Sequence, residues 1–254
     1  MGLWTPEHVR TLLPALAVML VLGIAAAKWL GPKDEKIRLI PMQVLACLLV
    51  ALEIGKQVLS FEDGYDLYHL PFHICSLFIF LLPIIAFYKG KYRPQMNAVT
   101  GAFCASVFLL MLIYPNLIYS AADVQNFFTN YFSFHTVAFH NIVMFAFVLI
   151  VALQLHTPQK GDQKAVVAFT VGFCVVSSSM AQLLKTNFAN FYSCNIPVFE
   201  DLRMKMREVL GIVPTQIIYV LIVSALTIGF VLMSYWVCRG ASRIFFKKGD
   251  KLRA

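Results

Sequence analysis

Residues Leu70–Phe87 read LPFHICSLFIFLLPIIAF and decide the fold class of this chain. From Leu77 onward the stretch is apolar and carries no charge, as expected of a helix in the hydrocarbon of a membrane. Its beginning differs, because His73 and Cys75 stand two residues apart where the apolar run opens. The stretch therefore predicts a membrane helix with polar, reactive side chains at one end.

The composition extends this prediction to the whole chain. Of the 254 residues, 59% are hydrophobic and 13% are charged, far from the ~25% charged residues typical of a soluble domain. The apolar runs are long and continuous, whereas the strands of a membrane barrel would alternate over about 10 residues. We expect one all-α, polytopic membrane domain over residues 1–254, with no separate soluble domain.

Seven apolar runs, each bounded by charges, proline or glycine, predict a seven-transmembrane helix bundle. The predicted spans are 11–30, 39–59, 72–88, 97–118, 132–155, 165–184 and 213–237. Lys and Arg concentrate in the connections after the first, third and fifth runs and in the C-terminal tail, and such residues mark the cytoplasmic side. The predicted orientation is N-out/C-in. The net charge of +8 then reflects topology and anionic lipid, and we expect no nucleic-acid partner.

Polar residues of the predicted spans gather near the outer face. Ionisable side chains within a span are costly and usually face the bundle interior, where they mark function. With a rise of ~1.5 Å per helical residue, the polar residues of four spans lie within roughly 15 Å of one interface. They are Glu53, Lys56, His73, Cys75, His135, His140, Asn187 and Asn190. Their shared depth predicts a pocket that opens to the outer leaflet.

A cysteine and a histidine in such a pocket are the minimum set for nucleophilic acyl transfer. The imidazole takes the thiol proton, the thiolate attacks an ester carbonyl, and the imidazolium protonates the departing alcohol. Cys75 is the candidate nucleophile, and His135 and His140 are both candidates for the base. The amide of Asn187 or Asn190 could donate a hydrogen bond to the oxyanion.

Two other interpretations concern the charged and metal-ligating residues. Glu53 and Lys56 lie three residues apart on one helix face, which favours a structural ion pair, although Lys56 could instead meet a lipid phosphate. A metal site is less consistent with the spacing. His135 and His140 are five residues apart and so lie about 140° away from sharing a face, by the ~100° step of a helix. We expect neither a metal nor a cofactor.

Four motifs in order resemble the YwaF-like family of bacterial integral membrane proteins. They are LPFHICS (Leu70–Ser76), YPN (Tyr114–Asn116), SFHTVAFHN (Ser133–Asn141) and TNFAN (Thr186–Asn190), and the resemblance runs over roughly residues 40–200. Phe72 stands where that family has an aliphatic residue. A eukaryotic relative is an acyltransferase that remodels ether phospholipids through a Cys–His pair. The resemblance implies Cys75 as nucleophile, His140 as base, a membrane phospholipid or acyl-lipid as substrate, and a place in the bacterial plasma membrane.

Two function classes compete with lipid acyl transfer or hydrolysis. A small-molecule or ion transporter could use the Glu53/Lys56 pair, and the span number alone also fits a receptor or sensor. Transporters often show internal repeats and polar residues at the midplane, and this sequence has neither. The loop after the sixth span predicts an amphipathic interfacial helix, Val198 to Leu210, over the pocket mouth. The sequence carries no signal for an oligomeric state.

Overall fold

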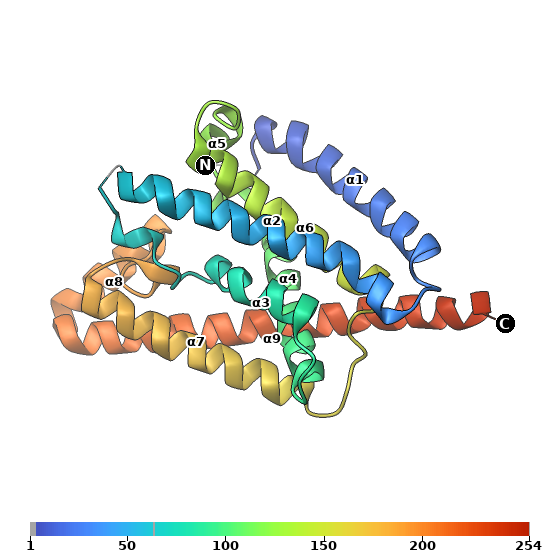
Figure 1. The fold of residues 1–254 in the computed structure, drawn as a ribbon. Coiled ribbons are helices and arrows are strands. Elements are labelled where there is room, and N and C mark those ends of the chain that lie inside the picture. The colour runs from blue at the N-terminus through green and yellow to red at the C-terminus, as the bar shows by residue number, and fades with distance from the viewer. Residues whose placement is uncertain (1–3, 63, 254) are drawn as a thin grey trace.

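The protein is described by a computed structural model of residues 4–62 and 64–253, which fold into helices joined by short connections (Figure 1). The α-helices are α1 (Pro6–Trp29), α2 (Glu35–Glu62), α3 (Phe78–Phe87), α4 (Arg93–Ile113), α5 (Ala121–Gln125), α6 (Tyr131–Ala152), α7 (Asp162–Leu184), α8 (Pro197–Leu210) and α9 (Ile212–Arg253). The 3₁₀ turns are η1 (Leu67–His69), η2 (Cys75–Leu77), η3 (Pro115–Leu117) and η4 (Phe188–Asn190). No strand occurs in the described residues, so the all-α prediction is confirmed for them.

Six helices in the described part of the chain are long and apolar enough to cross a membrane: α1, α2, α4, α6, α7 and α9. Each coincides with one predicted span, and its first residue lies one to five positions earlier than predicted. Local sequence explains some of these early starts. Thr5 caps α1 and Asn130 caps α6, because each side chain accepts a hydrogen bond from a backbone N–H of the first turn.

The span predicted over 72–88 is shorter than expected, and the prediction of seven full spans is not confirmed. Helical structure begins at Cys75, and the apolar helix Cys75–Phe87 reaches about 20 Å, less than the ~30 Å of hydrocarbon. Two contacts hold the preceding residues out of the helix. The N–H of Phe72 donates to the carbonyl of Leu70 over 2.8 Å, and the His73 ring contacts the carbonyl of Tyr68 at 3.1 Å.

The helix α4 forms the centre of the bundle. Every residue from Asn97 to Val107 is buried, and α4 packs against α3, α6, α7 and α9. Small residues such as Ala98, Gly101 and Ala102 let neighbouring helices approach it closely, as is typical of helix packing in membranes. The core of the bundle is therefore built around α4. The two ends of the bundle differ, with a buried polar cluster at one and the exposed helix α8 at the other.

At one end, a buried histidine and carboxylate close the connection between α6 and α7. His156 Nε2 lies 3.2 Å from Asp162 Oδ2, and both side chains are about 2% exposed. Asp162 Oδ2 also accepts from the backbone N–H of Gln159 at 2.7 Å. The side chain of Asn97 donates to the carbonyl of Leu155, which fastens the same connection to α4. This polar cluster thus holds the backbone of the connection between α6 and α7 in place.

At the other end, α8 lies beside the end of α7 and the start of α9, far from the C-terminus (Figure 1). The predicted helix from Val198 to Leu210 is confirmed. Its apolar residues Val198, Leu202 and Val209 recur at helical spacing and are all exposed, as expected of a helix that lies in the membrane interface. Arg203 joins it to α9 through a 3.0 Å bond to the side chain of Gln216.

Candidate functional site

A cavity of about 580 Å³ lies among α2, α4, α6, α9 and the segments that contain η1, η2 and η4. All the residues predicted from their shared depth line it: Glu53, Lys56, His73, Cys75, His135, His140, Asn187 and Asn190. The structure thus brings them together from segments far apart in the sequence. Their chemical roles stay predictions, and their contacts within the cavity distinguish them sharply.

Cys75 opens η2, which runs directly into α3. Its thiol is free and belongs to the cavity lining. The first N–H groups of a helix have no partner within that helix, so the positive end of the helix dipole lies near this side chain and favours a thiolate. Burial in apolar surroundings acts in the opposite direction and favours the neutral thiol. Attack by Cys75 therefore requires a base that removes the proton.

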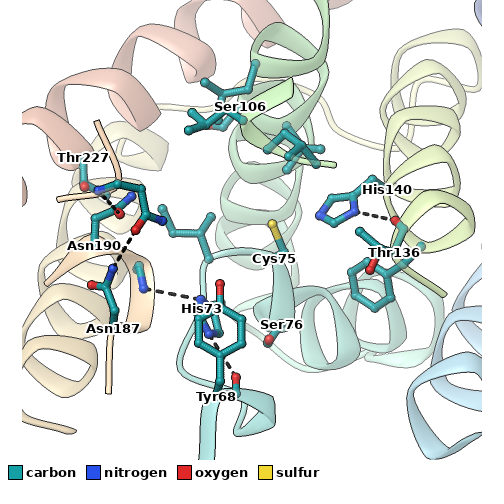
Figure 2. Close-up of a pocket in the computed structure, with 18 of the residues that line it drawn as sticks. Tyr68, His73, Cys75, Ser76, Ser106, Thr136, His140, Asn187, Asn190 and Thr227 are labelled. Carbon is teal, nitrogen blue, oxygen red and sulfur yellow. Dashed lines mark hydrogen bonds between the residues drawn. The ribbon is translucent and has the colours of Figure 1, made fainter. Parts of the chain in front are cut away.

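His140 is held in the tautomer of a base. Its Nδ1 lies 2.6 Å from the carbonyl oxygen of Thr136, one turn earlier in α6. Because a carbonyl can only accept, Nδ1 carries the proton and the lone pair of the neutral ring lies on Nε2. Nε2 is buried and has no hydrogen-bond partner in the described structure. In Figure 2 the ring extends toward the sulfur of Cys75, with the Thr136 bond on its far side.

His135 has a different partner. Its Nε2 lies 3.1 Å from Glu53 Oε2, and both side chains are 9% exposed. The carboxylate of Glu53 also accepts from Lys56 Nζ at 2.6 Å and from Gln57 Nε2 at 2.8 Å. The predicted ion pair of Glu53 and Lys56 is present. Of the two histidines that the sequence left as candidates for the base, His140 is the one with a free nitrogen that points to Cys75.

A close approach of α2 to α6 sets up the Glu53 contacts. A Cβ added at Gly55 would lie 2.1 Å from the hydroxyl oxygen of Tyr131, so that position requires glycine. The same hydroxyl donates to the carbonyl of Leu52 over 2.9 Å. Tyr131 and His135 lie one turn apart on α6, so the contact at Gly55 brings His135 to the carboxylate of Glu53.

His73 holds backbone in place. Its Nε2 lies 3.1 Å from the carbonyl of Tyr68, and its Nδ1 accepts from the N–H of Ala189 at 3.4 Å. With both nitrogens engaged, the ring joins the segment before Cys75 to the η4 loop, as Figure 2 shows. Ala189 and Asn190 have φ of 48° and 63°, a left-handed conformation that is costly for residues other than glycine. His73 helps to stabilise it.

The two predicted oxyanion donors differ in availability. Asn187 Oδ1 accepts from the N–H groups of Tyr192 and Ser193, and one N–H of its Nδ2 donates to Asn195, so three contacts hold its amide within the loop. Asn190 Oδ1 accepts from the N–H of Asn195. No described residue takes the Nδ2 of Asn190, which leaves this amide able to donate to a bound molecule.

Sequence reasoning missed several parts of the cavity. Thr136 fixes the His140 tautomer through its carbonyl, a role that residue type does not signal. One face of α9, including Val223, Leu226 and Phe230, forms an apolar wall. In the connection between α7 and α8 the lining reaches as far as Asn195, and it includes no residue of α8. The predicted position of that helix over the pocket mouth is therefore not supported. In the described residues no three His, Cys, Asp or Glu side chains gather to hold a metal.

Long apolar helices around a cavity with buried polar side chains define the class as a polytopic α-helical membrane protein. The sequence model of the TMEM164 family matches residues 3–237, so the chain belongs to the TMEM164 family. That is a membrane protein family, and the match does not single out the YwaF-like family that the motifs resemble. Searches of curated proteins and of solved structures gave no match.

Proposed function

We propose that this protein is a membrane-embedded, cysteine-dependent lipid acyltransferase or transacylase, or a lipid hydrolase. The observation that carries the proposal is the unpartnered Nε2 of His140, which points toward the free thiol of Cys75 inside a cavity. A thiol and a neutral imidazole with a free lone pair are the two groups that nucleophilic acyl transfer requires.

The steps follow from these two groups. His140 Nε2 takes the thiol proton as Cys75 Sγ bonds to the carbonyl carbon of an ester, and negative charge moves to the carbonyl oxygen. The C–O bond then breaks, and the imidazolium returns its proton to the departing alcohol oxygen. The product is an acyl thioester on Cys75. An acceptor hydroxyl completes a transfer, and water completes a hydrolysis, with His140 again as the base.

The amide of Asn190 is our candidate for the oxyanion donor, because its Nδ2 is not used within the described loop. The left-handed backbone at Ala189 and Asn190 supports this role, since such strain is often stored at functional sites. One donor to an oxyanion typically contributes about 3 kcal/mol to catalysis. Asn187 would act indirectly, by holding the loop in shape.

We place the protein in the plasma membrane of a bacterial cell, N-out/C-in, with the cavity open to the outer leaflet. The six long helices would span the bilayer, and the short α3 would complete a seventh, partial crossing that begins at Cys75. The exposed apolar face of α8 would lie in the outer interface. A phospholipid or acyl-lipid could then reach Cys75 from the bilayer, and its chain could contact Val107, Leu110 and Phe230.

The direct test is to incubate the purified protein with phospholipid and to look for acyl mass on the peptide that contains Cys75. We expect acylated Cys75 in the wild type and none in Cys75→Ala. Cys47→Ala is the matched control, because Cys47 is a free, exposed cysteine on α2 that does not line the cavity. Its acylation at Cys75 should equal that of the wild type.

A thiol-directed electrophile with a lipid tail supplies the second readout. It should label Cys75 faster than the other cysteines, and the labelling should slow in His140→Ala. A wild-type protein that neither acquires an acyl group nor reacts with this electrophile at Cys75 would contradict the proposal.

A further inference from the structure

Lys56 is the single cationic side chain among the described residues that line the cavity. Its side chain is 13% exposed, so the ammonium is largely removed from water. One of its three N–H groups is directed to Glu53 Oε1 at 2.6 Å, and no described residue accepts from the others. A buried cation in a membrane protein is costly and usually serves a site.

The Glu53 carboxylate does not depend on Lys56 alone. Gln57 Nε2 donates to Oε1 at 2.8 Å, and His135 Nε2 lies 3.1 Å from Oε2. Gln57 is itself oriented by the hydroxyl of Tyr65, which donates to its Oε1 at 2.8 Å. The ammonium of Lys56 can therefore turn to a second anion while the carboxylate keeps two donors.

The polar and the apolar residues of the cavity lining come largely from different elements. Its polar part includes Glu53, Lys56 and His69, which come from α2 and η1. Its apolar part includes side chains of α4 and α9. In Figure 2 the α4 residue Ser106 lies on the side of Cys75 opposite to Tyr68 of η1. A molecule that fills this cavity and has its ester at Cys75 thus meets both the cation of Lys56 and apolar side chains such as Val107 and Phe230.

We propose that Lys56 is the anchor of a phosphate-binding subsite. Its ammonium binds a lipid phosphate and gives up part of its ion pair with Glu53. The orientation of the lipid rests on the proposed acyl transfer at Cys75. A glycerophospholipid fits, because its phosphate and its acyl esters are carried by one three-carbon backbone. The carboxylate of a fatty acid would lie at the reacting position itself, and not beyond it.

The test measures binding without turnover, in the full chain with Cys75→Ala. The probes are a dialkyl glycerophospholipid, which has no ester to cleave, the corresponding uncharged dialkylglycerol, and inorganic phosphate, each measured in detergent micelles by native mass spectrometry. In this background Lys56→Gln should lower the affinity for the phospholipid analogue by about tenfold to a hundredfold, the range expected for the loss of a charge-assisted hydrogen bond. Binding of the dialkylglycerol should change by less than about twofold.

Two matched variants accompany this measurement. Lys56→Arg keeps the charge and should keep most of the affinity for the phospholipid analogue. Lys205→Gln removes one exposed positive charge of α8, outside the cavity lining, and should leave all affinities as they are. If Lys56→Gln lowers the affinities for the phospholipid analogue and for the dialkylglycerol equally, the proposal is overturned. Saturable binding of inorganic phosphate at Lys56, without preference for the lipid, would overturn the lipid as the source of the phosphate.

A second measurement uses Lys56 itself and does not require a folded Lys56→Gln variant. Acetylation of Lys56 by a small reagent should be slowed by the phospholipid analogue and not by the dialkylglycerol. Absence of this protection overturns the subsite even where Cys75 becomes acylated. Protection in a protein whose Cys75 never becomes acylated would instead support the subsite and contradict the proposed acyl transfer, so the two failures are distinguishable.

Discussion

The residues that the structure describes include two buried pairs of a histidine and a carboxylate, one near each end of the bundle. His135 and Glu53 lie 3.1 Å apart, and His156 and Asp162 lie 3.2 Å apart, with little exposure in either pair. We call them the outer pair and the inner pair, after the membrane orientation proposed above. Their surroundings differ. The first pair lines a cavity and is joined by Lys56, whereas the second is packed under the connection between α6 and α7.

This difference shows that a buried His–carboxylate pair does not by itself mark a site. Besides its contact with His156, Asp162 accepts from the backbone N–H of Gln159, and the neighbouring Asn97 donates to the carbonyl of Leu155. The polar groups at this end therefore hold the backbone of the connection in place. Glu53 has side-chain partners only, and two of the three, Lys56 and His135, line the cavity. The predictions below test this contrast, beginning with the largest effect.

The largest effect is expected at His140, which shares the cavity with the outer pair. His140→Gln should lower the rate of Cys75 acylation by about a hundredfold to ten-thousandfold, the usual contribution of a general base. His156→Gln, the matched control at the inner pair, should leave the rate per folded molecule unchanged. The measurement is the time course of acyl mass on the Cys75 peptide. Equal rates in the two variants would contradict the expectation that only the cavity histidine affects the reaction.

A second effect concerns stability. Glu53→Gln leaves the ammonium of Lys56 buried without its carboxylate and should lower the free energy of unfolding by about 3–5 kcal/mol. Asp162→Asn keeps an oxygen that can accept from Gln159 and should cost about 1–2 kcal/mol. Denaturant titration of both variants in mixed micelles gives the comparison. A larger loss in Asp162→Asn would show that the inner pair is the more important one for folding.

The pH dependence of stability separates the inner pair further. Burial lowers the pKa of His156 from its ordinary value of 6.5, so the folded protein keeps this ring neutral at a pH where the unfolded chain binds a proton. Stability is therefore fully present above about pH 6.5 and declines as the pH falls below that value. Melting temperatures between pH 5 and 8 should fall less steeply toward acid in His156→Gln than in the wild type. Parallel curves would contradict this assignment.

The smallest effect is expected on the surface, at α8. The Arg203 guanidinium donates to both oxygens of Glu200, and this hydrogen bonding lowers the pKa of the carboxyl. Glu200 also accepts from the N–H of Cys194. Glu200→Gln should cost about 0.2–1 kcal/mol, because the pair is partly exposed. The same denaturant titration measures it, and a loss as large as that of Glu53→Gln would mean that α8 is part of the core.

The positions of six long helices could be predicted from sequence, because a membrane span requires a long apolar run and little else. The segment 72–88 satisfied that criterion as well. Its helix starts only at Cys75, since the contacts of His73 with Tyr68 and Ala189 hold the preceding backbone in another conformation. The contact with Ala189 joins segments far apart in the sequence, and the apolar composition of residues 72–88 gives no information about it.

The sequence could predict which polar residues line the cavity, whereas the chemical roles of these residues stay predictions. Shared depth was sufficient to group the polar residues, because depth follows from counting residues along a helix. The choice between His135 and His140 depended on which ring nitrogen a carbonyl or carboxylate occupies, and sequence does not contain that information. The apolar wall of α9 was missed because residues that face a cavity and residues that face lipid are of the same types.

The left-handed residue Ala189 offers a means to vary rigidity separately from chemistry. Glycine adopts its φ of 48° at little cost, so Ala189→Gly would retain the backbone N–H that His73 accepts while it removes conformational strain and adds freedom to the unfolded chain. No group that reacts in the proposed mechanism would change. This one position could therefore show how much the rigidity of the loop, apart from its functional groups, governs which molecules enter the cavity.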